Sequence, residues 1–151
     1  MALRGFFVDN KGRRFPWGYS RGAAWSEDSI LTALPEGGFT PRIPHRPVAV
    51  LIGPETKSAG EALAVALWGH GSRTFGSATA GLSGGNSVYH LPDGALLALT
   101  EVLVASREGQ VVQRIEPDSS IGRARDNRRA DVADEAVRAA IRCLSLQAPC
   151  S

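Results

Sequence analysis

The segment Thr56-Lys57-Ser58-Ala59-Gly60-Glu61 places a serine where α/β proteins carry out much of their chemistry. It follows a continuous apolar run over residues 48–52, which is typical of a strand buried on both faces. A helix is expected to follow over residues 59–68. Because catalytic groups gather at the carboxyl ends of parallel strands, we expect the Ser58 hydroxyl to lie at the edge of the sheet. The N–H groups of Ala59 and Gly60 would point outward there and would be suited to stabilise an oxyanion.

The same residues also fit a purely structural role. Ser58 and Glu61 have the spacing of a capping box, in which the two side chains satisfy free N–H groups at the start of a helix. Neither spacing nor composition separates a capping serine from a nucleophile. Both interpretations therefore stay open on the pattern alone.

A nucleophilic serine needs a general base, and the chain offers few candidates. Lys57 adjoins Ser58, and we expect its side chain to project the other way. The remaining candidates are Lys11, His45, His70 and His90. His70 would lie at the far end of the helix that Ser58 begins, about 18 Å away at a rise of 1.5 Å per residue. The pattern therefore identifies no base.

The elements expected around Ser58 make an α/β fold with a mixed sheet. The expected apolar face of the first helix consists of Ala62, Leu63, Ala66 and Leu67. After it we expect, in order, a strand over 73–75, a glycine-rich loop over 76–86, and strands over 88–91 and 95–105 around the turn Pro92-Asp93-Gly94. The glycine-rich loop is either a flexible connection or a wall of a substrate groove.

Three segments of the chain differ in composition. Residues 1–46 are rich in turn residues and are predicted to form an irregular arm, with a hairpin around Asp9-Asn10-Lys11-Gly12. Residues 47–118 are expected to hold the core. Residues 119–151 are predicted to be a basic loop followed by a helix over 132–144, capped by Asp131. The expected apolar stripe of that helix consists of Ala133, Val137, Ala140, Ile141 and Leu144.

Length and composition exclude several classes of protein. The chain has 151 residues and a net charge of +2, which suits one globular domain. Its longest apolar run, over residues 48–52, is far too short for a membrane span, and residues 1–9 contain no apolar stretch of the length expected of a secretory signal. No phosphate-loop motif is present, and the arginine cluster over residues 123–129 contains no aromatic residue, which argues against nucleic-acid binding. Cys143 and Cys150 match no metal-ligand spacing and are either thiols or a disulfide.

Five short stretches, taken in order, resemble the distal part of the catalytic domain of tail-specific, or C-terminal-processing, serine peptidases. This family includes the tricorn core protease and the interphotoreceptor retinoid-binding protein repeats. The matching stretches are residues 47–51, residues 56–61, Phe75-Gly76 with Thr79-Ala80-Gly81-Leu82, Leu91-Pro92-Asp93-Gly94, and Ile115-Glu116-Pro117-Asp118. No single stretch is decisive for the resemblance, but five stretches in register over about 70 residues are specific for this family. The resemblance favours the nucleophile interpretation of Ser58.

The resemblance implies a crotonase-like, ββα-type peptidase core that is truncated at its N-terminus. It implies that Ser58 is the nucleophile, that the Ala59 N–H is one oxyanion donor, and that Glu116 orients the catalytic network. The alternative for Glu116 is a surface carboxylate. The glycines expected to line the substrate groove are Gly81, Gly84 and Gly85. The implied substrate is a peptide or an unfolded protein, and no metal or organic cofactor is implied.

The chain also departs from the family pattern. In the Ser-Lys branch a lysine falls 25 residues after the serine, and here that position is Ser83. The family's Asp-Leu-Arg-x-Asn-x-Gly-Gly stretch is absent, because Leu3-Arg4-Gly5 is followed by Phe6. We therefore expect a distal half whose base comes from a second chain or an upstream half, with weak activity and self-association. The alternatives are a non-catalytic remnant that binds peptides or a partner, and a small-molecule acyl hydrolase.

Overall fold

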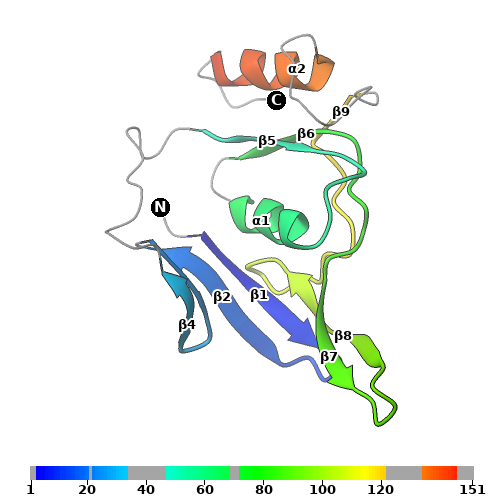
Figure 1. Ribbon diagram of the computed structural model, residues 1–151. Coiled ribbons are helices and arrows are strands. Elements are labelled where there is room, and N and C mark those ends of the chain that lie inside the picture. Colours follow the sequence, from blue (N-terminus) through cyan, green and yellow to red (C-terminus); the bar gives the residue numbers. More distant parts are fainter. Residues whose placement is uncertain (1–2, 21, 34–46, 69–71, 122–133, 146–151) are drawn as a thin grey trace.

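Two β-sheets and two helices make up the part of the chain that the computed structural model describes, residues 3–20, 22–33, 47–68, 72–121 and 134–145 (Figure 1). The fold is mixed α/β, as expected. In chain order the elements are β1 (Leu3–Asp9), β2 (Arg14–Ser20), β3 (Ala23–Ser26), β4 (Ser29–Ala33), β5 (Ala49–Ile52), α1 (Ala59–Leu67), β6 (Arg73–Gly76), β7 (Gly84–His90), β8 (Leu96–Ala105), β9 (Ser119–Ser120) and α2 (Glu135–Ser145).

The larger sheet has six strands in the order β4-β3-β2-β1-β8-β7, and all neighbouring pairs are antiparallel. The expected hairpin is formed by β1 and β2. The prediction of an otherwise irregular arm is wrong for the described residues between 3 and 33, which form four strands. The physical reason is strand pairing: each of the four strands pairs with its neighbour in sequence, and β1 also pairs with β8, with Phe6 opposite Ala105. Residues 34–46 lie outside the described part.

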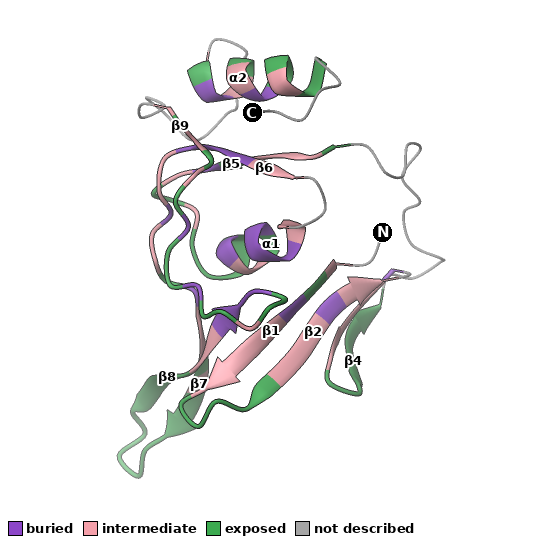
Figure 2. Cartoon of the chain, turned by 180° about the vertical axis from the view of Figure 1, so that it is seen from behind, coloured by how far each residue is buried: buried purple, intermediate pink, exposed green. Residues whose placement is uncertain are grey.

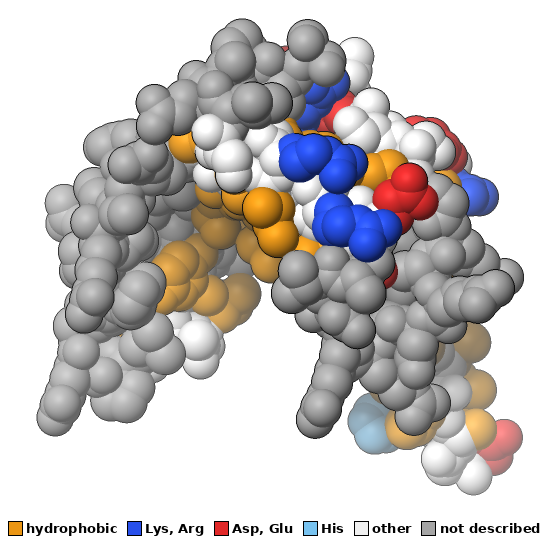
Figure 3. Space-filling view, turned by 90° about the horizontal axis from the view of Figure 1, so that it is seen from above, with side chains coloured by type: hydrophobic (Ala, Val, Ile, Leu, Met, Phe, Trp, Pro, Cys, Tyr) orange, Lys and Arg blue, Asp and Glu red, His pale blue; other side chains and the backbone are white. Residues whose placement is uncertain are grey.

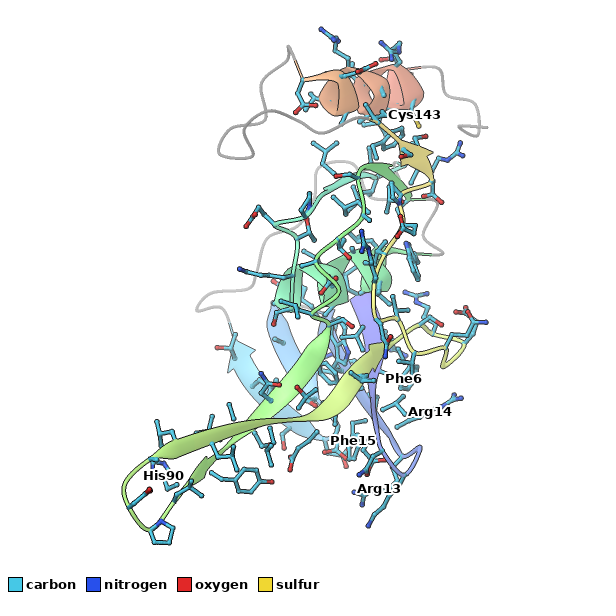
Figure 4. All side chains as sticks on the ribbon, turned by 90° about the vertical axis from the view of Figure 1, so that its right-hand side faces the viewer. Phe6, Arg13, Arg14, Phe15, His90 and Cys143 are labelled. Atoms are coloured by element: carbon cyan, nitrogen blue, oxygen red, sulfur yellow. The ribbon has the colours of Figure 1, made fainter. Side chains whose placement is uncertain are left out.

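The turn between β1 and β2 is fixed by the Asp9 carboxylate. It accepts hydrogen bonds from the Lys11 N–H at 2.9 Å, the Arg13 N–H at 2.8 Å and the Arg13 Nε at 2.7 Å. Burial of Asp9 acts to raise its pKa, but these hydrogen bonds and the charge of Arg13 outweigh that effect and leave the pKa below its ordinary value. Arg13 also lies over the ring of Phe15, and Figure 4 shows both at this end of the sheet.

Asp9→Asn should flatten the acid side of the stability profile. A carboxylate whose pKa is lowered in the folded chain stabilises it above the unfolded pKa, about 3.9, and this contribution is lost as the pH falls through the folded pKa. Urea midpoints measured between neutral and acid pH should therefore fall less steeply for the variant than for the parent. Identical slopes would show that the Asp9 hydrogen bonds do not contribute to the pH dependence of the stability.

The smaller sheet consists of the parallel strands β5, β6 and β9, and α1 lies between the two sheets. The strand-helix-strand unit formed by β5, α1 and β6 matches the expectation. The expectation that residues 48–52 are buried on both faces is wrong, because β5 is an edge strand and Leu51 remains 43% exposed. Residues 119–120, expected in a loop, form β9 by pairing with Phe75 and Gly76.

The core lies between α1 and the two sheets, as Figure 2 shows by its purple segments. Its buried members are Ile52, Ala64, Val65, Val104, Val112 and Ile115. The helix face predicted from periodicity is partly wrong: Ala66 is buried, but Leu63 is 49% exposed. Because a sheet covers α1 on each side, its contact surface differs from the single stripe of a surface helix.

Helix α2 lies on the other side of the smaller sheet and packs against β5 and β6. The Asp134 carboxylate accepts a hydrogen bond from the Ala136 N–H at 2.8 Å at the start of the helix. The predicted cap, Asp131, lies outside the described residues. Ala136 and Ala140 are buried, whereas Ile141 and Leu144 are exposed, so the predicted stripe is only partly correct.

The outer face of α2 is charged, with exposed Glu135, Arg138 and Arg142. Figure 3 views the molecule from this side and shows basic side chains gathered beside acidic ones. Cys143, labelled in Figure 4, is disulfide-bonded. Cys150 and the arginine cluster over residues 123–129 lie outside the described residues. None of the described helices is both long and apolar enough to cross a membrane.

The β7–β8 hairpin forms around the predicted turn and projects away from the rest of the molecule (Figures 1 and 2). Both of its faces are exposed near the tip. The exposed apolar residues of the hairpin are Val88, Tyr89, Leu91, Leu96, Leu97 and Leu99. Such a surface is typical of a segment that associates with another polypeptide.

Candidate active site

Ser58 has an unusual backbone conformation at the junction between β5 and α1. Its φ is 51° and its ψ is −119°, and its side chain is exposed. A residue that only caps a helix normally has φ and ψ in the β region. A non-glycine residue at positive φ carries strain of order 1–3 kcal/mol, and such strain is concentrated at functional sites. A sharp, strained strand-to-helix turn that exposes a serine is also how α/β-hydrolases present their nucleophile.

The carboxylate of Glu61 holds this turn in place. Glu61 is fully buried, and its Oε2 accepts hydrogen bonds from the Ser58 N–H at 3.2 Å and the Leu82 N–H at 3.0 Å. Its Oε1 accepts hydrogen bonds from the Thr79 hydroxyl at 2.5 Å and the Gly81 N–H at 2.9 Å. The Ser58 N–H also donates to the Leu82 carbonyl at 3.1 Å. One buried carboxylate therefore joins the start of α1 to the glycine-rich loop.

Glu61→Gln should lower the free energy of unfolding by about 1–3 kcal/mol. The amide NH₂ group would face N–H donors, and a buried donor without an acceptor costs about 1–3 kcal/mol. Urea denaturation measures the effect. Glu55→Gln is the matched control, because Glu55 is exposed just before the same turn and should change stability by no more than about 0.5 kcal/mol. Equal stability of the two variants would contradict the role given to Glu61.

An open groove of about 570 Å³ lies in front of Ser58. Its lining residues are Lys57, Ser58, Gly81, Leu82, Ser83, Gly84, Asn86, Thr100, Leu103 and Gln113. The structure thus brings together three of the predicted site residues, Ser58, Gly81 and Gly84. Gly85 is not part of the lining. A Cβ at Gly84 would lie 2.5 Å from the Thr100 Cγ2, so any other residue here would require the Thr100 side chain to shift.

The N–H groups after Ser58 are not equivalent. The Gly60 N–H donates to the Lys57 carbonyl at 3.0 Å, so it is engaged within the turn, contrary to the expectation that it points outward. The Ser58 N–H donates to Glu61 and Leu82. Of the two donors expected from the sequence, this leaves the Ala59 N–H at the exposed start of α1.

Glu116 is not brought into the groove. Its side chain is 74% exposed, and its Oε1 lies 3.3 Å from the Arg114 Nε in an ion pair. The role of Glu116 in a catalytic network therefore stays a prediction.

The candidate bases are distributed unevenly. Lys57 lines the groove together with Ser58, although we expected the two to diverge. His90 ends β7 and lies on the projecting hairpin (Figure 4), about 20 Å along the strand from Gly84 at 3.3 Å per residue. His45 and His70 lie outside the described residues. Ser83, at the position where the Ser-Lys branch has its lysine, is 3% exposed, and its hydroxyl donates to the carbonyl of Val112.

Lys57→Met should leave probe labelling and turnover within a few-fold of the parent. Lys57 is exposed, and a lysine acts as a base chiefly where burial removes its hydration. A loss of about 10²-fold or more, the scale of general-base catalysis, would contradict this prediction and favour a Ser-Lys mechanism.

The outer end of the groove is polar. The Thr100 hydroxyl donates to Asn86 Oδ1 at 2.7 Å, and both residues line the groove. Beside them, hydrogen bonds from the hydroxyls of Ser87 and Tyr89 lower the pKa of Glu101. The hydrogen bond to Glu101 raises the pKa of Tyr89. Among the described residues, no three His, Cys, Asp or Glu side chains are grouped so that they could hold a metal ion.

Two residues of this region were not recognised from the sequence as parts of the site. Glu61 was visible as the glutamate of a capping box, but that spacing does not show that its carboxylate also accepts donors from residues 79–82. Thr79 belongs to one of the stretches that resemble the peptidase family, but the stretch does not show its hydrogen bonds to Glu61 and Ile115, which are distant in sequence.

The fold and the site together define a mixed α/β protein with an exposed serine at a strained strand-to-helix turn. Sequence comparison gives the family: the profile of peptidase family S41 matches residues 14–121. The chain belongs to peptidase family S41. No curated protein matches the chain.

Solved structures agree with this assignment at the level of the fold. A lipoprotein from Streptococcus agalactiae is 25% identical, with a TM-score of 0.57, and the match covers 81% of this chain and 41% of the lipoprotein. A "putative peptidase" from Parabacteroides merdae ATCC 43184 is 21% identical, with a TM-score of 0.54, and the match covers 94% of this chain and 43% of that protein. The chain therefore spans about two fifths of the length of these two proteins.

Proposed function

We propose that the chain is the Ser58-bearing part of a serine peptidase of the tail-specific type with a crotonase-like core. The observation that carries this proposal is the strained, exposed Ser58 on an open groove at the start of α1. A capping role alone does not require a positive φ. Membership of peptidase family S41 supports the hydrolytic chemistry.

The proposed reaction is hydrolysis of a peptide bond through an acyl-enzyme. The Ser58 Oγ attacks the carbonyl carbon and loses its proton to a base, and the Ala59 N–H stabilises the oxyanion. The amine then leaves with a proton from the conjugate acid of that base. Water attacks the ester, the carboxylic acid is released, and the Ser58 hydroxyl is restored.

The proposed substrate is a peptide or an unfolded protein. Gly81 and Gly84 give the groove wall next to Ser58 no bulky side chains, and we propose that Gly85 extends this wall along β7. A main chain in extended conformation could therefore approach the serine closely. The small-molecule acyl hydrolase expected as an alternative would need no such open groove.

Reaction with a fluorophosphonate probe tests the proposal. The purified chain is incubated with the probe, and the modified residue is located by peptide mapping. Modification at residue 58 is expected. Modification elsewhere, or none in a folded chain, would contradict the proposal.

A partner-associating domain is the second candidate function. The apolar residues exposed on the β7–β8 hairpin favour it, because exposed apolar patches are typical of surfaces that bind another protein. A folded chain that is not labelled and forms oligomers would support this candidate. The two functions are compatible if a second chain supplies the base or if the chain self-associates.

A further inference from the structure

We propose that Thr79 is a positioning residue that couples the Ser58 turn to the segment carrying Glu116. This inference rests on the proposed function of Ser58. Thr79 is 2% exposed and lies in the glycine-rich loop, outside the lining of the groove. It would therefore act through its hydrogen bonds and not by touching substrate.

The first link runs from Thr79 to Ser58. The Thr79 hydroxyl donates to Glu61 Oε1 at 2.5 Å, and the other oxygen of the same carboxylate accepts the Ser58 N–H. Glu61 is fully buried, so water does not compete for these bonds. The Thr79 hydroxyl thus supplies one of the four hydrogen bonds that orient the Glu61 carboxylate, and among these four it is the one from a side chain.

The second link runs from Thr79 to the segment before Glu116. The Ile115 N–H donates to the Thr79 hydroxyl oxygen at 3.0 Å, and the Thr79 N–H donates to the Ile115 carbonyl at 3.1 Å. Ile115 is 1% exposed. A hydroxyl both donates and accepts, so this single group satisfies Glu61 and Ile115 together.

Thr74 provides an internal control of the same chemistry. It is 1% exposed, its hydroxyl donates to Asp118 Oδ2 at 2.8 Å, and it accepts the Asp118 N–H at 2.9 Å. Thr74 therefore fixes the other end of the segment that contains Glu116. It has no hydrogen bond to Glu61 among the described residues. Loss of its hydroxyl should leave the Ser58 turn unaffected.

The test compares Thr79→Val, which removes the hydroxyl at constant shape, with Thr79→Ser, which keeps it. Amide hydrogen exchange at Ser58, Leu82 and Ile115 is measured by NMR, together with the rate of probe labelling. In Thr79→Val we expect these amides to exchange about tenfold faster or more and labelling to slow by a similar factor. Thr79→Ser should stay within about threefold of the parent, because it retains both hydrogen bonds. Thr74→Val should accelerate exchange at Asp118 but not at Ser58 or Leu82.

Unchanged exchange in Thr79→Val, or equal disturbance in Thr79→Ser, would overturn the inference. If Thr79→Val does not fold, NMR of the parent chain provides the test. A slowly exchanging Thr79 hydroxyl proton close to the Ile115 amide supports the inference, and absence of this signal overturns it. Absence of Ser58 labelling in the folded parent overturns the proposed function instead. The exchange data would still show whether the two segments are coupled.

Discussion

Ser58→Ala is expected to abolish covalent labelling by a fluorophosphonate and to leave the chain folded. These probes need a nucleophilic hydroxyl, and Ser58 presents one at an exposed, strained turn on the groove. The substitution removes only the Oγ. The main-chain hydrogen bonds from residue 58 to Glu61 and Leu82 remain, so the loss of stability should not exceed about 2 kcal/mol, the upper end for a helix cap.

Ser83→Ala is the control for this experiment. Ser83 lines the same groove, but its hydroxyl is buried and donates to a main-chain carbonyl. The variant should be labelled like the parent. Circular dichroism and thermal unfolding would establish that both variants are folded. Equal labelling of Ser58→Ala and the parent would remove Ser58 from the mechanism.

The purified chain is expected to cleave casein at least about 10²-fold more slowly than a complete serine peptidase. Of the oxyanion donors, the described residues supply the Ala59 N–H, and the loss of one donor costs about 10²–10³-fold in turnover. The described lining of the groove holds no histidine, and loss of a general base costs a further 10²–10⁴-fold or so. These factors need not multiply, because catalytic groups act as a unit.

Casein turnover by the purified chain, with Ser58→Ala as the blank, measures this prediction. Size-exclusion chromatography of the same sample reports whether the active species is a monomer. Robust Ser58-dependent cleavage by a monomer would contradict the prediction. It would mean that a base within the chain, such as His45 or His70, reaches the serine.

The local parts of the fold could be predicted from the sequence. The apolar run before Ser58, the helix after it and the next strand follow from short-range patterns, and the structure has them as β5, α1 and β6. The turn Pro92-Asp93-Gly94 likewise predicted the β7–β8 hairpin. The helix faces were less accurate, because burial of Leu63 or Ile141 depends on which sheets cover a helix and not on its own periodicity.

The non-local parts could not be predicted. The described residues between 3 and 33 read as turns and short apolar groups, and the sequence does not show that β8 pairs with β1 at the edge of their four strands. The same holds for the candidate site. The serine and the glycines were visible as residue types, whereas the positive φ of Ser58 and the four donors around Glu61 arise from the assembled loop.

The pairing of β1 with β8 also has a consequence for how the chain folds. Phe6 finds its neighbour Ala105 about 100 residues later, so the larger sheet is joined by a contact of very long sequence separation. Contacts of this kind require closure of a large loop and slow the folding reaction. During synthesis, β1 to β4 would emerge before β8, and the β1 edge would stay unpaired until residues 102–105 follow. In that interval the free edge of β1 is exposed to other chains. Pairing of β1 with a strand of another chain then competes with its pairing with β8.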